Sequence, residues 1–513
     1  MMRLRENGSN ALLNSTFCRC NQKMQIIPLY LLKTKKWLHD KLHQKNEITY
    51  LSNLKNLFMS KLRFNSKNGF LQMEDLPHNC IFNKVVTGCG GTTIALFNKE
   101  NYIIAVPTTE LITNKTGLTE AGTAIITSPD GSTQCCAFGL FGTFSYDVKK
   151  ALKEYAATGG TKKILCTYDK VRYLKDYLNL ADYRILVDEY HQLLKAYSYR
   201  QIAVNGVLEN YRLFKSFCFM SATPISPDFT PSLLKGIEQV EAVWENTDTM
   251  IVKLEQTNKP YIKAANIIKH YKQDGYINVN GQKSHEAFFF INSVTDIASI
   301  LKYCQLTDDE VKIVCADNNE NRKKLDGYTI SNSRGENRMF TFITSKSFEG
   351  ADFFSDTGLC FVVSNSNNRN TLLDISTDIY QIAGRIRTEK NPFRNMLVHI
   401  FNTTGKRKLN LDITYEEVKQ KVQEEVEGAN AYIELANTNE GARRMADKML
   451  NSLYIMKDKS GNYFLNDMLV KLDLLNYQIE HQIYHTGIQL KKHYETNSTL
   501  TTEIEYERFK EDI

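Results

Sequence analysis

Short apolar runs, separated by polar and helix-compatible stretches, recur in two blocks along this 513-residue chain. In residues 70–245 the runs are Tyr102–Val106, Lys163–Cys166, Arg184–Val187 and Ser216–Met220. In residues 246–405 they are Ala287–Ile291, Lys312–Cys315, Met339–Ile343, Gly358–Val363 and Met396–Phe401. Strands that alternate with helices favour a parallel sheet covered on both faces. We therefore predict an α/β fold with two parallel-sheet domains of similar size.

The two ends of the chain differ from these blocks. Residues 1–69 carry thirteen Lys and Arg against three Asp and Glu, while the rest of the chain is close to neutral. A basic extension favours an anionic partner such as nucleic acid, but a solvated tail or an early start codon, with Met24 as the alternative start, explains it equally well. Residues 406–513 have helix-like spacing over Tyr415–Leu435 and Asn466–Tyr494, which predicts a helical accessory domain.

Cysteine spacing and the length of the apolar runs indicate the cellular compartment of the protein. The eleven cysteines form no CxxC pair, so they are predicted to be reduced thiols and not zinc ligands. The run Ile26–Leu32 is too short to span a bilayer. The sequence therefore predicts a cytoplasmic protein without a membrane partner.

A glycine-rich loop lies near the start of the first block. Residues 87–93 read Thr-Gly-Cys-Gly-Gly-Thr-Thr, after a predicted strand end and before a helix that begins near Thr92. Glycines let such a backbone curl so that its N–H groups point into one concavity, and the helix N-terminus adds a positive dipole end. The loop is predicted to bind phosphate through Gly88, Cys89, Gly90, Gly91, Thr92 and Thr93.

Two adjacent carboxylates, Asp188 and Glu189, follow the apolar run Arg184–Val187. The carboxyl end of a parallel strand is where α/β sheets bind ligands. An Asp there can hold Mg²⁺ while the neighbouring Glu orients or deprotonates water. A solvated helix N-terminus is the alternative explanation, since acidic residues are common there. His191, two residues on, could couple this site to the second domain.

Polar groups in the second block show a helical spacing. Gln381, Gly384, Arg385 and position 388 are spaced i, i+3, i+4 and i+7, and would share one face of a regular helix. Position 388 is Thr, and Arg387 would lie about 100° off that face. The Pro at position 392 makes an earlier helix end plausible, which would bring Arg387 into use.

In their order along the chain, four motifs resemble motifs II, III, V and VI of the DEAD/DEAH-like helicases of superfamily 2. They are Asp188-Glu189-Tyr190-His191, Ser221-Ala222-Thr223, Phe348-Glu349-Gly350-Ala351-Asp352 and Gln381-Ile382-Ala383-Gly384-Arg385. Residues 107–111 and 167–169 are similar to motifs Ia and Ib. The resemblance covers roughly residues 70–405. It implies two RecA-like P-loop NTPase domains with ATP and Mg²⁺ in the cleft between them.

The resemblance also implies roles for individual residues. Glu189, Asp188, Arg385 and Gln381 would be catalytic, and Thr92 with Asp188 would hold Mg²⁺. Gly350, Asp352 and Arg387 would contact the nucleotide. Gly91 stands where the family carries its lysine, so Lys84 is predicted to supply that charge, with a surface lysine as the alternative. This lysine-free loop is similar to that of helicase-like proteins of tailed bacteriophages, including the crAss-like group, which implies a host bacterial cytoplasm.

The predicted function is an ATP-dependent helicase or translocase on nucleic acid, DNA first and RNA second, with replication or transcription partners. One alternative is a helicase-shaped nucleic-acid-binding protein that has lost hydrolysis, favoured by Gly91 and Thr388. Another is a motor subunit of a larger replication, restriction or transcription complex. The intact pair Asp188 and Glu189, with Arg385, favours the active enzyme.

Overall fold

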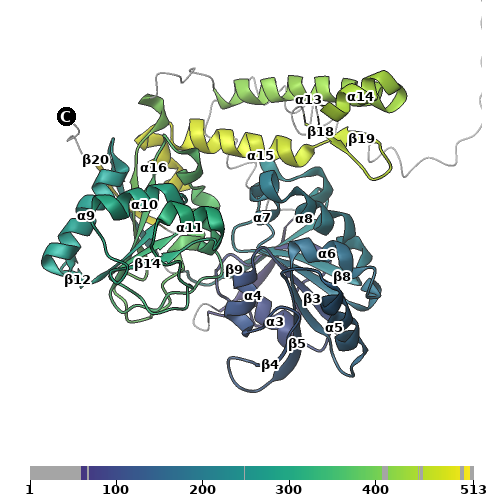
Figure 1. The fold of residues 1–513 in the computed structure, drawn as a ribbon, viewed down its shortest axis with the longest axis horizontal. Coiled ribbons are helices and arrows are strands. Elements are labelled where there is room, and N and C mark those ends of the chain that lie inside the picture. Colours follow the sequence, from purple (N-terminus) through teal and green to yellow (C-terminus); the bar gives the residue numbers. More distant parts are fainter. Residues whose placement is uncertain are drawn as a thin grey trace, which may run out of the picture. The chain divides into compact units, whose positions relative to one another are not determined.

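The computed structural model describes residues 59–65, 69–247, 249–406, 414–448, 450, 454–496 and 502–508. Residues Ser60–Ile513 form one compact unit, which contains a nine-stranded and a seven-stranded sheet (Figure 1). Most of the predicted basic extension, residues 1–69, lies outside the described residues, so its role stays a prediction.

The first sheet has the strand order β1-β9-β2-β8-β7-β3-β6-β5-β4. Its pairs from β9 through β5 are parallel, and the added β4–β5 pair is antiparallel. The four strands predicted in this block are confirmed. The strands are β1 (Met59–Phe64), β2 (Cys80–Asn83), β3 (Tyr102–Val106), β4 (Thr123–Thr127), β5 (Gln134–Leu140), β6 (Lys163–Thr167), β7 (Arg184–Asp188), β8 (Ser216–Ser221) and β9 (Glu238–Trp244).

Helices cover both faces of this sheet, which explains why its central strands are buried along almost their whole length and mainly apolar. In β3, Tyr102 and Ile104 belong to the apolar cluster that contains Leu96 of α3, whereas Ile103 belongs to the cluster that contains Val207 of α8. The helices of this block are α3 (Gly91–Phe97), α4 (Thr109–Thr116), α5 (Tyr146–Ala157), α6 (Tyr168–Leu174), α7 (Gln192–Lys195) and α8 (Tyr197–Asn210).

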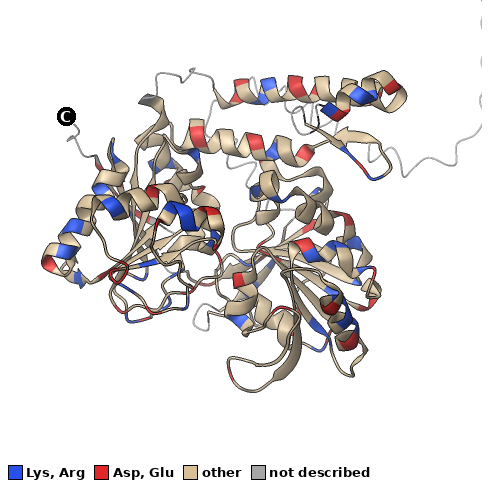
Figure 2. Cartoon of the chain, in the orientation of Figure 1, with Lys and Arg blue, Asp and Glu red and all other residues tan. Residues whose placement is uncertain are grey.

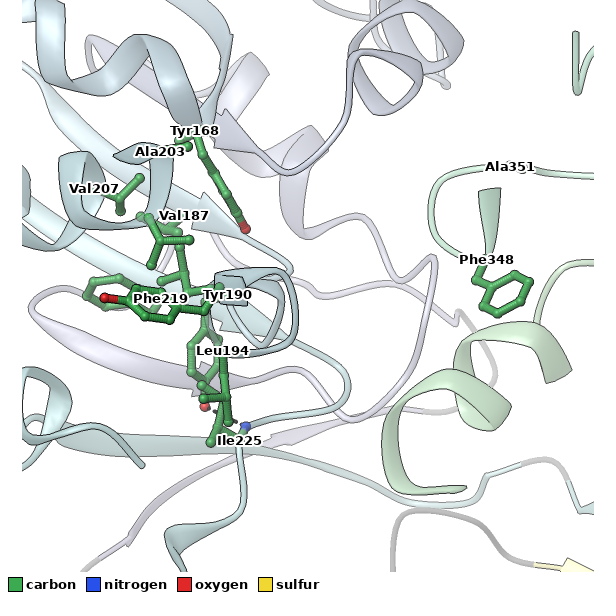
Figure 3. Close-up of a cluster of buried hydrophobic side chains, with 14 of the residues drawn as sticks. Tyr168, Val187, Tyr190, Leu194, Ala203, Val207, Phe219, Ile225, Phe348 and Ala351 are labelled. Carbon is green, nitrogen blue, oxygen red and sulfur yellow. Dashed lines mark hydrogen bonds between the residues drawn. The ribbon is translucent and has the colours of Figure 1, made fainter. Parts of the chain in front are cut away.

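The buried side chain of Tyr190, just before α7, connects the segments that follow β7 and β8. Tyr190 lies in the cluster with Val187, Leu194 and Phe219, and its hydroxyl accepts a hydrogen bond of 3.1 Å from the backbone N–H of Ile225 (Figure 3). The chain after β7 and the chain after β8 are thereby tied together, immediately behind the polar residues at the ends of those strands.

The second sheet is parallel throughout, in the order β14-β15-β13-β16-β17-β10-β20. The five strands predicted in residues 246–405 are confirmed. The strands are β10 (Met250–Gln256), β13 (Glu286–Phe290), β14 (Val311–Val314), β15 (Phe340–Ile343), β16 (Gly358–Ser364), β17 (Met396–Phe401) and β20 (Thr502–Arg508). Between them lie α9 (Pro260–Asp274), the hairpin β11 (Ile277–Val279) and β12 (Gln282–Ser284), α10 (Val294–Tyr303), α11 (Asn319–Leu325) and α12 (Tyr380–Ala383).

The C-terminal part is largely helical, as the spacing predicts. A capping box formed by Thr414 and Glu417 begins α13 (Tyr415–Thr438). After it come α14 (Glu440–Lys448), the hairpin β18 (Ile455–Lys457) and β19 (Tyr463–Leu465), α15 (Asp467–Tyr477) and α16 (Gly487–Thr496). The chain then adds β20 to the second sheet beside β10. The fold is thus two RecA-like parallel-sheet α/β domains with a helical C-terminal region. Among the described residues, we find no helix with the length and apolar character needed to cross a bilayer.

Candidate active site

The carboxyl ends of β2, β7 and β8 meet at one edge of the first sheet. In the parallel register Asn83 lies opposite Ser221, and Asp188 lies opposite Met220. Lys84 and Glu189, which directly follow β2 and β7, and Ser221, the last residue of β8, therefore lie close together at this edge. Three segments that are far apart in the sequence supply one polar cluster.

The predicted phosphate loop, residues 87–93, follows β2, and the chain from Lys84 through this loop has three residues in the left-handed region. They are Val85, Gly88 and Gly90, with φ of 62°, 73° and 85°. For a β-branched residue such as Val85 this conformation is strained. It is held by the Val85 N–H, which donates to Asn83 Oδ1 at 3.0 Å, and by the Tyr380 hydroxyl, which donates to the Val85 carbonyl. The second domain thus contacts the base of the loop.

Gly91 is the first residue of α3, and the space beside its Cα is occupied by the side chain of Met220. A Cβ built at Gly91 would lie 2.5 Å from Sδ of Met220. Because Met220 is fully buried on β8, a side chain at position 91 requires the methionine to move. The packing of Met220 therefore leaves no space for a lysine side chain at position 91.

The carboxylate pair is buried and held by cations and hydroxyls. Asp188 Oδ2 accepts a hydrogen bond of 2.7 Å from the Thr92 hydroxyl. Lys84 Nζ lies 3.0 Å from Glu189 Oε1 and 3.6 Å from Asp188 Oδ1. Burial by itself raises the pKa of Asp188, but the charges of Lys84 and then Lys115 outweigh it and lower that pKa to about 2. For Lys84 burial acts to lower the pKa, and the charges of Glu189 and Asp188 raise it above its ordinary value.

Glu189 has partners different from those of Asp188. Its backbone is left-handed, with φ of 52°. Its Oε2 accepts hydrogen bonds from the Ser221 hydroxyl at 3.1 Å and from Gln381 Nε2 at 3.2 Å. Ser221 belongs to the first domain and Gln381 to the second, so this carboxylate is shared between them.

His191 joins the same cluster to the second domain. Its Nδ1 lies 2.8 Å from Ser221 Oγ, and its Nε2 lies 2.6 Å from Glu349 Oε1. Gln192 also donates to Glu349 Oε1, at 2.6 Å. Burial by itself lowers the pKa of His191, but the charge of Glu349 and the hydrogen bond to it raise that pKa above its ordinary value. The contact with Glu349 therefore stabilises the imidazolium form of His191.

The helix that carries Gln381 is shorter than its spacing suggests. α12 ends at Ala383, with Gly384 as its C-cap, so the regular helix assumed for positions 381–388 is wrong beyond Ala383. Arg385 is buried, and it donates to the carbonyls of Gln381 at 2.7 Å and Ala351 at 3.2 Å. Burial lowers its pKa to about 10.

Arg387 is the arginine that lies against the phosphate loop. A Cβ built at Gly88 would be 3.0 Å from its Nη2. Its Nε donates to Asp352 Oδ1 at 2.7 Å, which fixes the direction of the guanidinium. Because α12 ends at Ala383, Arg387 lies outside the helix and can reach the loop, as the alternative with an early helix end predicts.

The predicted nucleotide residues surround one cavity of 240 Å³. Its lining includes Lys84, Thr87, Gly88, Cys89, Gly90, Gly91, Thr92, Thr93, Lys115, Glu189, Gly350, Asp352, Arg385 and Arg387. Asp188 is buried beneath it, and Gln381 reaches it through Glu189. Lysine and arginine outnumber carboxylates in this lining, which suits an anionic ligand.

The donor set also suits Mg²⁺. The Thr92 hydroxyl and the Asp188 carboxylate are hard oxygen ligands of the type that Mg²⁺ takes. The ammonium of Lys115 already stands at this pair, 2.9 Å from Thr92 Oγ1 and 3.6 Å from Asp188 Oδ2. Within the described part of the chain, no group of three or more His, Cys, Asp or Glu residues could hold a metal by itself. Lys115 was missed by sequence reasoning, because it lies 23 residues from Thr92 and belongs to no motif.

Two larger cavities, of 500 and 610 Å³, adjoin the strand ends of both domains. Both include Tyr199, Gln192, Asn292 and Ser345, and the larger one adds Thr108 and Lys346. Thr108 lies in the motif Ia-like segment. In the motif Ib-like segment Tyr168 is instead buried, and its hydroxyl donates to the Asp188 carbonyl at 2.5 Å.

Comparison with known proteins finds no matching family model and no matching curated protein. Several solved structures are similar in fold. DEAD-box helicase Mss116 bound to ssRNA and UDP-BeF is 11% identical, with 84% of this chain and 90% of that chain covered, at a TM-score of 0.39. Mycobacterium smegmatis helicase Lhr bound to ssDNA and AMP-PNP is 10% identical, with 77% and 57% covered, at 0.37. S. cerevisiae Dbp5 bound to Nup159, Gle1, IP6 and ADP is 13% identical, with 66% and 84% covered, at 0.35. At such identities, the chemistry of this chain follows only from its own side chains.

Proposed function

We propose that this chain is a motor of the superfamily 2 helicase or translocase type, which uses ATP to move on a nucleic acid strand, with DNA expected first. The observation that carries the proposal is the sharing of Glu189 between the two domains. Its carboxylate is reached by Gln381 of the second domain at 3.2 Å, while Arg387 of the same domain lies against the phosphate loop. A site that needs both domains is one whose chemistry can be coupled to their relative movement.

Each residue then has a specific task. The backbone of the phosphate loop and Arg387 bind the phosphates. Thr92 and Asp188 would hold Mg²⁺, which would neutralise phosphate charge. Glu189 orients the attacking water and takes its proton. For this step the contact between Glu189 Oε1 and Lys84 would lengthen to admit the water while Lys84 stays beside Asp188, and Ser221 and Gln381 would keep Oε2 in position.

The nucleic acid strand is proposed to lie across the two larger cavities. Acidic and basic residues are interspersed along the helices of the described chain (Figure 2), so the contacts expected here are mainly hydroxyl and amide donors to the strand backbone. Tyr199, with 75% of its surface exposed, offers an aromatic face on which a base can stack.

The direct test is the release of phosphate from ATP with and without single-stranded DNA or single-stranded RNA. We expect hydrolysis that either strand stimulates, and the stronger activator identifies the substrate. Hydrolysis without any response to either strand would refute the motor. Displacement of a labelled strand from a duplex then separates a helicase from a translocase.

A helicase-shaped binding protein is the second candidate. The ion pair of Lys84 with Glu189 favours it, because it occupies the proposed general base, and so does Gly91. In that case the chain binds nucleotide and strand but releases no phosphate. A motor subunit that depends on another chain would instead release phosphate only with its partner present.

A further inference from the structure

The loop lacks the lysine that usually contacts phosphates, and two lysines from other segments reach the same cavity. They are Lys84, which follows β2, and Lys115, in the last turn of α4. A missing positive charge at a phosphate site is a large loss unless another group replaces it. The surroundings of the two lysines decide which of them can do so.

Lys84 is already committed within the protein. Its side chain is 6% exposed, and its ammonium lies between Glu189 at 3.0 Å and Asp188 at 3.6 Å. Withdrawing it would leave two buried carboxylates without their principal counter-ion, which is strongly unfavourable. Lys84 is therefore the internal partner of the acidic pair.

Lys115 has the opposite character. Its side chain is 39% exposed and lines the cavity, and its ammonium lies 3.6 Å from Asp188. A lysine in the last turn of a helix commonly interacts with the terminal carbonyls. Here the ammonium instead leaves its helix and donates to the Thr92 hydroxyl of the phosphate loop at 2.9 Å. Its long flexible stem lets it turn from Thr92 towards a phosphate without moving α4.

We infer that Lys115 is the phosphate-binding lysine of this chain and replaces the lysine that is absent at Gly91. The inference rests on the proposed function and specifies which group contacts the outer phosphates of a nucleoside triphosphate. The packing of Met220 against Gly91 and the approach of Lys115 to Thr92 are then two parts of one arrangement. The positive charge at the phosphates is then supplied by a residue of α4 and not by a residue of the loop itself.

Calorimetric titration with Mg-ATP and with adenosine tests the inference. In Lys115→Ala, ATP affinity should fall on the order of ten- to a hundredfold, the range for a lost charge-assisted hydrogen bond, with adenosine affinity unchanged. Lys115→Arg should retain most of the ATP affinity. Lys150→Ala, at an exposed lysine of α5, should match the parent and serves as the control.

Lys84→Met separates the two lysines. It should lower the melting temperature, whereas Lys115→Ala should leave it unchanged. Adding Gly91→Lys and Met220→Ala to the Lys115→Ala variant should restore its ATP affinity. The smaller residue at position 220 leaves space for the new lysine at position 91. Parental ATP affinity in Lys115→Ala would overturn the inference and leave the motor intact. A parent protein that binds no ATP would overturn both.

Discussion

At the scale of single residues, the site is built from side chains that each have several partners. Glu189 contacts Lys84, Ser221 and Gln381, so its position is specified from three directions. Groups held in this way need little reorganisation during a reaction, which is the main source of electrostatic catalysis. A conservative change at such a position should alter chemistry more than shape.

Glu189→Gln should keep ATP binding and lose hydrolysis. The amide has nearly the same shape but cannot take a proton from water, and a positioned general base is worth roughly 10²–10⁴ in rate. Phosphate release and ATP titration on the same sample measure both properties. Glu209→Gln, at an exposed position of α8, is the matched control. Unchanged hydrolysis in Glu189→Gln would remove this residue from the mechanism.

Gly91→Ala should destabilise the protein, although alanine is the better helix former. The new Cβ would overlap Met220 Sδ, and overpacking of a buried site costs about 1–3 kcal/mol. Chemical unfolding of the single variants and of Gly91→Ala with Met220→Ala measures the coupling. The cost of the alanine should be smaller when Met220 is absent. A cost that is the same in both backgrounds would contradict the packing argument.

At the scale of helices and strands, buried polar groups connect the elements. His399 of β17 lies 2.9 Å from the Tyr494 hydroxyl of α16 and 3.0 Å from the Ser364 hydroxyl of β16. Burial lowers the pKa of His399 to about 3. Folding therefore keeps this imidazole neutral under conditions in which the unfolded chain would protonate it.

This depressed pKa predicts acid sensitivity. Between pH 3 and the ordinary histidine value near 6.5, the unfolded state binds more protons at this position, so stability falls as the pH falls below about 6.5. At pH 5 the loss should be about 2 kcal/mol, from 1.5 units at about 1.36 kcal/mol each. Unfolding midpoints between pH 5 and 7 should show a weaker pH dependence in His399→Gln. His270→Gln, at an exposed position of α9, should keep the parental slope, and an unchanged slope in both variants would refute the assignment.

The exposed face of α8 offers a test of strand binding. Tyr199→Ala should weaken binding of single-stranded DNA, because stacking of one base on an aromatic side chain is worth about 1–3 kcal/mol. Fluorescence anisotropy with a labelled oligonucleotide measures this loss. Tyr146→Ala on α5 removes an equally exposed tyrosine, 78% exposed, away from the cavities, and should bind as the parent does. Equal affinities of all three proteins would place the strand elsewhere.

At the scale of the whole molecule, the two domains meet through buried polar contacts as well as apolar ones. His191 with Glu349, and Glu189 with Gln381, are the contacts that join the second domain to the acidic pair and its neighbour His191. A change in either contact is therefore a route by which nucleotide chemistry can be transmitted to the second domain.

Glu349→Gln should weaken this transmission. The change keeps the size of the side chain but removes the charge that raises the pKa of His191. We expect stimulation of hydrolysis by single-stranded DNA to fall by roughly fivefold or more, the lower end of typical coupling energies. The ratio of rates with and without DNA is the measurement, and Glu336→Gln, at an exposed side chain, is the control. A parental ratio would make the contact merely structural.

Much of the fold was predictable because central strands buried on both faces leave continuous apolar runs. All nine strands predicted from such runs are present. β10 and β20 were missed because they alternate apolar and charged residues, as in Val252, Lys253 and Leu254. The predicted boundaries at 69, 245 and 405 stay predictions, as do the catalytic roles.

The sequence by itself indicated which segments come together as the candidate site: the loop at 87–93 after β2, the acidic pair at the end of β7, and the polar groups of the second domain after β15 and on α12. Contacts between segments distant in the sequence were decided only by tertiary structure. Lys115 meets Thr92, Met220 fills the space beside Gly91, and Arg387 lies against Gly88 after α12 ends at Ala383, while Arg385 lines the same cavity. The physical reason is that local spacing records which way a side chain leaves its own element, whereas its partner depends on how the elements pack.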